Sequence, residues 1–265
     1  MFAQLFRSSL LACCLISLAN AGERIITLTP HATELVFAAG AGDQIIATVE
    51  SSDFPEAAKA ITRIGDGLNT SAEQVIAMHP DVVIGWPSPL MSQLQSLGIR
   101  TIVSDPNSLE AIAQEVLELG TVFGTSAKAN AWLEQFTQKM LKLAQPVPQD
   151  PDRPLRIVIL ASADGQFAIG RHALINDTIN RCGISNAFEA TQSAAPQISR
   201  ESLLAAKPDV IISGTPLEDA QSMMPIAPLH IVAADWLYRP GPRFIDAALE
   251  ICALARQTSQ APTKP

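Results

Sequence analysis

The chain has 265 residues, a formal net charge of −8 and a sequence isoelectric point near 5.0. An acidic chain without a basic patch suits neither nucleic acid nor an anionic membrane as a partner. Hydrophobic residues make up 48% of the sequence. This is enough to form the core of one large domain or of two moderate ones.

The first 21 residues have the pattern of a secretory signal peptide. Arg7 precedes the apolar stretch 10–18, and Ala19-Asn20-Ala21 fits a small-x-small cleavage site. Later apolar runs fall short of the roughly 20 residues that a membrane helix needs. We therefore expect an exported protein. Lipid attachment at Cys13 is the alternative, although its apolar region would be unusually short.

Residues 22–107 alternate short apolar segments with helical ones. The first expected strand, residues 24–28, precedes an apolar helix over 35–39, which Thr29 or Thr33 can cap and Gly40 can end. Further strands are expected at 45–49, 82–84 and 98–103. Such alternation indicates a mainly parallel sheet covered by helices on both faces.

Residues 108–154 change to long helices followed by a linker. Apolar residues recur at helical spacing up to a break at 124–126, and a second helix is expected over 127–145. The proline-rich segment 146–154 reads as a stiff, extended linker. We expect the second helix to bridge two lobes. Because a helix resists hinge motion, closure around a ligand should be small.

The second lobe, residues 155–265, begins with a strand at 155–160 and ends with a helix over 243–256. It also repeats part of the first lobe, since the pattern of segment 71–84 returns at 199–212. Each copy has a Ser cap, a Glu in the first helical turn, a Pro that ends the helix and a buried strand. The repeat predicts two similar α/β lobes of Rossmann-like type with a ligand cleft between them. It also places Glu73 and Glu201 at equivalent surface positions.

Two cysteines, Cys182 and Cys252, remain after cleavage of the leader, in a compartment that permits disulfides. A bond between them would close a loop of about 70 residues and stabilise the fold by at most roughly 4 kcal/mol. Two buried free thiols are the alternative, and metal binding by two distant cysteines is a weaker one.

Motifs typical of enzymes are absent from the sequence. It contains no Gly-x-Ser-x-Gly elbow, no His-Glu-x-x-His and no phosphate-binding glycine loop. The histidines His31, His79, His172 and His230 do not have the spacing of a ligand cluster. We therefore expect no catalytic residues, no metal site and no resident cofactor.

Several of these features together resemble the helical-backbone substrate-binding proteins of bacterial ABC importers, which bind cobalamin (vitamin B12), haem or ferric siderophores. The resemblance rests on the signal peptide, Thr-Pro-His-Ala-Thr-Glu at 29–34, the paired Glu segments, the spacer helix and Asp235-Trp236. It spans essentially the whole mature chain and is strongest for the members that bind cobalamin.

The resemblance implies a periplasmic protein that captures cobalamin or a related corrinoid and delivers it to an ABC importer. In the family, the carboxylates that match Glu73 and Glu201 pair with arginines of the permease dimer. The alternative is that both acids only favour a helix N-terminus. The cysteines that match Cys182 and Cys252 form a disulfide in cobalamin-binding members. We expect a monomer.

The resemblance also implies ligand contacts. Trp86 and Phe167 would pack on the corrin, while Asp235 and Arg239 would hydrogen-bond its amide side chains, with Trp236 beside them. Aromatic walls and a few polar anchors suit a large, mostly apolar disc. Core packing is the alternative role for the three aromatic residues.

The chain also departs from the cobalamin-binding pattern. Ser51, Gly67 and Ala195 stand where those proteins carry aromatic residues, with Phe54 or Tyr238 as candidates to compensate. His31 is a further candidate, because haem-binding relatives use His or Tyr as an iron ligand. Hydrogen bonding to its own loop is its alternative role. Haem or a ferric siderophore is thus the alternative ligand, but basic residues near the expected cleft, Arg239, Arg171 and Arg63, are few.

Overall fold

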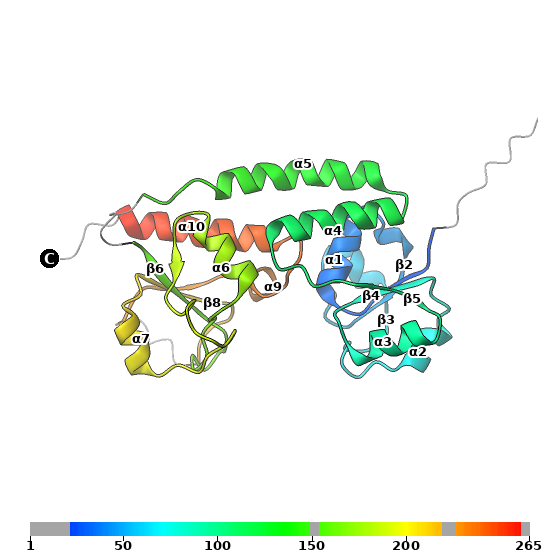
Figure 1. Ribbon diagram of the computed structural model, residues 1–265, viewed down its shortest axis with the longest axis horizontal. Coiled ribbons are helices and arrows are strands. Elements are labelled where there is room, and N and C mark those ends of the chain that lie inside the picture. The colour runs from blue at the N-terminus through cyan, green and yellow to red at the C-terminus, as the bar shows by residue number, and fades with distance from the viewer. Residues whose placement is uncertain (1–21, 149–153, 219–225, 261–265) are drawn as a thin grey trace, which may run out of the picture.

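The computed structural model describes residues 22–148, 154–218 and 226–260, which form two α/β lobes joined by helices (Figure 1). The predicted signal peptide, residues 1–21, lies outside the described residues, as do residues 149–153 of the predicted linker. Within the described part of the chain, no helix is both long enough and apolar enough to cross a membrane.

The first lobe is built on a parallel sheet with the strand order β3-β2-β1-β4-β5. The strands are β1 (Ile25–Thr27), β2 (Ile45–Thr48), β3 (Thr62–Arg63), β4 (Val82–Gly85) and β5 (Arg100–Val103). The helices are α1 (Pro30–Ala38), α2 (Ala72–Ala77) and α3 (Pro89–Ser96), with short 3-10 helices η1 (Gly42–Gln44) and η2 (Glu56–Ala60).

The second lobe repeats this plan on a parallel sheet of order β7-β6-β8-β9. The strands are β6 (Arg156–Leu160), β7 (Ser185–Asn186), β8 (Val210–Ser213) and β9 (Leu229–Ile231). The helices are α6 (Ala173–Asn180), α7 (Arg200–Ala206), α9 (Ala234–Leu237) and α10 (Phe244–Gln260). This order matches β2-β1-β4-β5 of the first lobe, so the prediction of two similar parallel-sheet lobes is confirmed.

Strand residues alternate between two cores. In β4, Val82 and Ile84 join the large core, whereas Val83 joins a separate cluster on the other sheet face. In β8, Val210 and Ile212 join the same large core and Ile211 joins a third cluster. Successive side chains of a strand point to opposite faces, so a parallel strand covered on both sides must be apolar throughout.

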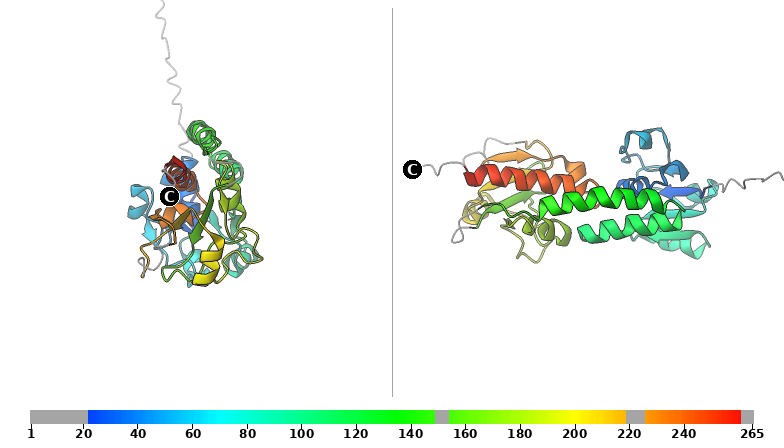
Figure 2. Two further views of the ribbon diagram at one scale, coloured as in Figure 1. Left: turned by 90° about the vertical axis from the view of Figure 1, so that its left-hand side faces the viewer. Right: turned by 90° about the horizontal axis from the view of Figure 1, so that it is seen from above.

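The lobes are joined along one side by α4 (Leu109–Val122) and α5 (Ser126–Leu143). Helix α5 has 18 residues and is therefore about 27 Å long. It packs on α4 of the first lobe and on α10 of the second, and the three helices lie side by side (Figure 2). One hydrophobic cluster runs from Leu35 through Phe136 to Ile251. The predicted bridging helix is thus present, and it is seated on a core that both lobes share.

The repeated segments share their backbone geometry as well as their sequence. Ser71 and Ser199 each form a capping box at the start of α2 and α7. A residue with positive φ follows each helix: His79, at 48°, comes directly after the C-cap of α2, and Lys207, at 46°, is the C-cap of α7. The carboxylates of Asp81 and Asp209 accept hydrogen bonds from the backbone N–H of Arg24 and Arg156, at 2.8 and 3.0 Å. In both lobes, the aspartate thus connects the loop before one strand, β4 or β8, to the start of the neighbouring strand, β1 or β6.

Some boundaries differ from those expected. Helix α1 begins at Pro30 with Thr29 as its cap, because Pro is favoured at the first helical position. Asp235 lies in the first turn of the short helix α9. Helix α10 continues to Gln260.

The cysteine pairing is confirmed, since Cys182 and Cys252 form a disulfide with a Cα–Cα distance of 6.2 Å. The bond connects Cys182, which follows α6, with Cys252 of α10, so it lies within the second lobe.

Candidate ligand-binding cleft

A cavity of about 390 Å³ lies between the lobes. The first lobe contributes Trp86 and residues 105–107, and the second lobe contributes residues 171–174, residues 237–240 and Phe244. Its volume is at the lower end of the roughly 300–1,000 Å³ typical of ligand pockets. The expected cleft between the lobes is therefore present.

The cavity lies at the carboxyl ends of the strands, because the residues that follow those strands form its walls. Trp86 follows β4 and Asp105 lies two residues after β5. In open parallel sheets, ligands bind in the crevice at these strand ends, where loops rather than sheet hydrogen bonds fix the side chains. The same rule applied to β5 finds residues 105–107, which our reading of the sequence missed.

Trp86 is the main aromatic surface of the cavity. Its side chain is 46% exposed although it is a large hydrophobic residue. The ring packs on the imidazole of His31, with 5.0 Å between ring centroids and 32° between planes. Trp86 therefore presents one side to the cavity while it covers a neighbour on the other.

His31 lies in the first turn of α1 and is only 1% exposed. Its Nε2 lies 3.1 Å from Ser104 Oγ and 3.3 Å from the Ser104 carbonyl oxygen. Burial lowers the pKa of His31 to about 4, against the hydrogen bond to Ser104, which raises it. The imidazole is therefore neutral near pH 7 and has little surface open to the cavity. Its hydrogen bonds thus go to the loop after β5 and not, as the alternative role supposed, to its own loop.

The other aromatic candidates have different surroundings. Phe167 follows β6, is 38% exposed and is not among the residues that line the cavity. Trp236 is partly buried and packs against the large core.

Tyr238 lines the cavity and is fixed by its hydroxyl, which donates to the Leu160 carbonyl oxygen at 2.5 Å and accepts from Gly214 N–H at 3.2 Å. Phe54 is half-exposed beneath the Arg243 guanidinium, which lies 4.2 Å from its ring centroid.

Positions 51, 67 and 195, where the cobalamin-binding pattern has aromatic residues, differ in whether a larger side chain would fit. Ser51 and Ala195 are exposed. Gly67 has a φ of +87°, and a Cβ there would lie 2.7 Å from the Leu28 carbonyl oxygen. The loop thus favours glycine at position 67, and an aromatic side chain there would require a different loop conformation.

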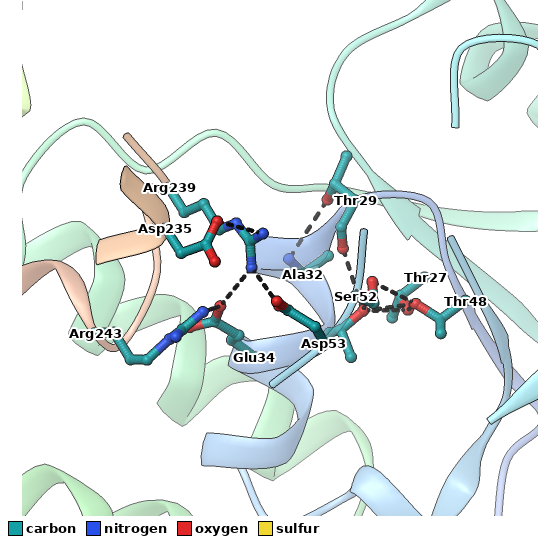
Figure 3. Close-up of polar contacts among 11 residues, drawn as sticks. Thr27, Thr29, Ala32, Glu34, Thr48, Ser52, Asp53, Asp235, Arg239 and Arg243 are labelled. Atoms are coloured by element: carbon teal, nitrogen blue, oxygen red, sulfur yellow. Dashed lines mark hydrogen bonds and ion pairs between the residues drawn. The ribbon is translucent and has the colours of Figure 1, made fainter. Parts of the chain in front are cut away.

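A network of five charged side chains crosses between the lobes next to the cavity (Figure 3). Glu34 and Asp53 belong to the first lobe, and Asp235, Arg239 and Arg243 belong to the second. We call these five residues the interlobe charge network. Arg239 Nη1 lies 2.8 Å from Asp53 Oδ1 and 3.5 Å from Glu34 Oε1, while its Nη2 lies 2.6 Å from Asp235 Oδ1. Three carboxylates therefore surround the Arg239 guanidinium, which also lines the cavity.

Burial and pairing shift the pKa values in this network. Burial raises the pKa of Glu34, against the hydrogen bonds and charges of Arg243 and Arg239. For Asp53, burial also raises the pKa, but the hydrogen bond and charge of Arg239 outweigh it, so the pKa is lowered. Asp235 is 43% exposed while it binds Arg239. Of the predicted polar anchors, Asp235 is thus more open to a ligand than Arg239, whose side chain is 16% exposed.

Glu73 and Glu201 are exposed and lie in the first turns of α2 and α7. Hydrogen bonds from its own backbone N–H and from Ser71 lower the pKa of Glu73, and those from its own N–H and Ser199 lower that of Glu201. Both helices lie on the side of their lobes away from α5 (Figure 1). The acids are thus ionised near pH 7, and the two helices that carry them lie on one side of the molecule (Figure 1).

Two parallel-sheet lobes, a rigid helical bridge and an interlobe cavity define a two-lobed ligand-binding protein. The sequence profile of the "Periplasmic binding protein" family matches residues 25–225. The chain belongs to this family.

Individual relatives agree with this assignment. The chain is 31% identical to a "Vitamin B12-binding protein" of Yersinia pestis (strain Pestoides F) over 92% of this chain and 89% of the relative. Among solved structures, it resembles the periplasmic vitamin B12 binding protein BtuF of Vibrio cholerae, with a TM-score of 0.77, 26% identity, and coverage of 90% of this chain and 98% of that one. The periplasmic heme-binding protein RhuT from Roseiflexus sp. RS-1 shares the fold, with a TM-score of 0.72, 23% identity, and coverage of 90% and 100%.

Proposed function

We propose that the protein is a periplasmic substrate-binding protein that holds cobalamin in the interlobe cavity and delivers it to the permease of an ABC importer. The observation that carries this proposal is that the cavity is lined both by the exposed indole of Trp86, at the strand ends, and by the Arg239 guanidinium, whose charge three carboxylates neutralise. Similarity to proteins named for vitamin B12 binding supports the same ligand.

The interlobe charge network favours a ligand with little net charge. Arg239 is in contact with Asp53, Asp235 and Glu34, so its guanidinium offers little unpaired positive charge to an anion. Corrin is a mostly apolar disc that can pack on Trp86. The neutral amides at its edge can donate hydrogen bonds to Asp235. A corrinoid is larger than the cavity, so part of it would extend into solvent between the lobes.

Haem is the second candidate, since Arg171 and His172 also line the cavity. Arg171 could pair with a carboxylate of haem, and imidazole is a common ligand of haem iron. His172 Nδ1 accepts a hydrogen bond from Ile175 N–H at 3.4 Å, as the cap of α6. Iron ligation by Nδ1 would therefore break that cap. Nε2 carries the proton of the neutral ring, so it has no lone pair to offer to iron. We therefore favour cobalamin.

We further propose the accessory features of such a protein. Residues 1–21 would direct export, residues 22–107 and 155–265 would form the two lobes, and residues 108–154 would join them. The mature protein would act as a monomer without enzymatic activity or a resident cofactor. Glu73 and Glu201 would bind the two halves of the permease dimer. Because the lobes share a core and an ion-pair network, ligand release would require the permease to separate them.

Calorimetric titration of the purified mature protein with cyanocobalamin and, separately, with haemin tests the proposal. We expect saturable binding of cyanocobalamin with quenching of tryptophan fluorescence, and recovery of the ligand unaltered. Replacement Trp86→Ala should weaken this binding at least tenfold, whereas the matched control Trp132→Ala, on α5 away from the cavity, should not. Tight binding of haemin with no response to cyanocobalamin would refute the assignment.

A further inference from the structure

Trp86 projects from the end of a strand into a cavity, yet its indole has a defined support. The inner face of the ring lies on His31 at a centroid distance of 5.0 Å. Offset and tilted ring pairs at this distance attract each other by more than their buried area alone provides. The orientation of the exposed indole therefore depends on the orientation of His31.

The orientation of His31 depends in turn on the loop that follows β5. Ser104 Oγ donates its proton to Glu115 Oε2 at 2.6 Å. Since a hydroxyl has one proton, its oxygen acts as acceptor toward His31 Nε2 at 3.1 Å. His31 Nε2 thus carries the hydrogen and donates it to Ser104. A chain of contacts runs from Glu115 of α4 through Ser104 and His31 to Trp86.

An imidazole is an unfavourable choice for this place if only packing is required. His31 is 1% exposed, and its Nδ1 is buried without a hydrogen-bond partner among the described residues. A buried polar atom without a partner costs stability, which a phenyl ring or a leucine would avoid. What the imidazole provides and those side chains lack is a flat face together with a hydrogen bond to the end of β5.

We infer that His31 is a positioning residue that fixes the indole of Trp86 at the wall of the cavity. The inference rests on the proposed ligand-binding role of this cavity. The residues that follow β1, β4 and β5, which are neighbours in the sheet, thereby act as one unit. A side chain held in its bound orientation loses less conformational freedom on binding, which increases affinity for a flat ligand.

The three tryptophans of the chain allow a direct test. A variant with Trp132→Phe and Trp236→Phe keeps Trp86 as its single fluorophore, and serves as parent. We expect His31→Ala to increase acrylamide quenching of Trp86 at least twofold, to lower its fluorescence anisotropy and to weaken cyanocobalamin binding five- to tenfold. Ser104→Ala keeps the imidazole and loses its anchor, so it should shift each quantity in the same direction by less. His31→Phe restores a flat face and should recover most of the anisotropy.

A control separates positioning from stability. Leu94→Ala removes a fully buried side chain from the separate cluster of the first lobe, so it lowers the melting temperature without touching Trp86. The inference is wrong if His31→Ala lowers the melting temperature as Leu94→Ala does but leaves Trp86 quenching and anisotropy at parental values. Should His31→Ala not fold, Ser104→Ala is compared with the parent by the same criteria. The fluorescence measurements need no ligand, so failure of cobalamin binding in the parent would refute the proposed function without deciding this inference.

Discussion

Arg243 of the second lobe donates two hydrogen bonds to Glu34 of the first. Its Nε lies 3.0 Å from Glu34 Oε2 and its Nη2 lies 2.6 Å from Oε1. The Glu34 carboxylate is 2% exposed and the Arg243 side chain 15%. This pair lies on the cavity side of the bridging helices and gives the lobes a second connection. It adds to the rigidity expected from α5 alone.

Removal of one partner of this pair should destabilise the whole protein. Arg243→Met keeps most of the side-chain volume and leaves the buried Glu34 carboxylate with Arg239 alone. Loss of one partner of a buried pair costs about 3–5 kcal/mol. We expect a decrease near the lower value, measured as the free energy of unfolding in urea, because Arg239 partly compensates.

Two further variants test whether the unpaired Glu34 carboxylate causes this loss of stability. The double variant Glu34→Gln with Arg243→Met leaves no unpaired buried charge, and should recover part of the loss. Lys59→Met breaks the exposed pair with Glu56 and should leave the free energy of unfolding unchanged. An Arg243→Met protein as stable as the parent would show that the pair contributes nothing to the joining of the lobes.

The burial of His31 predicts a dependence of stability on pH. Its pKa is about 4 in the folded protein and 6.5 as the ordinary value. Between these pH values the unfolded chain takes up a proton at His31 and the folded protein does not. The free energy of unfolding should therefore fall as the pH decreases from about 6.5 to about 4, by up to about 3 kcal/mol from this residue.

Other groups titrate nearby, so the test compares two proteins. Burial raises the pKa values of Glu34 and Glu115, which acts in the opposite direction because the folded protein then retains protons that the unfolded chain loses. The difference in free energy of unfolding between parent and His31→Phe cancels these contributions. That difference should shift in favour of His31→Phe as the pH is lowered. A difference independent of pH would mean that His31 is protonated equally in both states.

Local patterns predicted most of the strands and caps, but not the contacts between distant parts of the chain. Apolar β-branched runs identified β1, β4, β6 and β8, which are buried on both faces. The short strands β7 and β9 carry polar or half-exposed residues, as at Ser185 and His230, and therefore lack such a signal.

In the candidate site, too, contacts between distant parts of the chain were not predicted. The resemblance predicted ligand contact for Trp86, which does line the cavity. The burial of His31 beneath it, and the pairing of Glu34 with Arg243 across 209 positions of sequence, depend on how the lobes pack. Neither spacing nor composition encodes such contacts.

The paired acids give a prediction about transport. Glu73→Arg with Glu201→Arg should abolish cobalamin uptake by cells that depend on this protein, because like charges would face the arginines of the permease. Affinity for cyanocobalamin should remain within about twofold of the parent value, since both acids are exposed and neither lines the cavity. Glu134→Arg makes the charge change of one of these two substitutions at an exposed position of α5 and should not affect uptake. A loss of ligand affinity in the double variant would place these acids in the binding site instead.

The disulfide gives a prediction about stability under reducing conditions. Cys182→Ala with Cys252→Ala removes a cross-link between residues 70 positions apart. This should lower the free energy of unfolding by about 4 kcal/mol in the chain-entropy description. Dithiothreitol should lower the stability of the parent to a similar extent and leave the double variant unchanged. Equal stability of all samples would mean that the cross-link does not constrain the unfolded chain.

The interlobe charge network predicts how ligand preference can be altered. Asp53→Asn with Asp235→Asn removes two of the three carboxylates around Arg239 and keeps the size of each side chain. The guanidinium then faces the cavity with more unpaired positive charge, which favours anionic ligands. We expect the ratio of haemin affinity to cyanocobalamin affinity to rise about tenfold. Asp43→Asn, at the amino end of β2 and thus at the opposite edge of the sheet, is the matched control and should leave the ratio unchanged. If the double variant keeps the parental ratio, neutralisation of Arg239 does not determine the charge of the ligand that this protein selects.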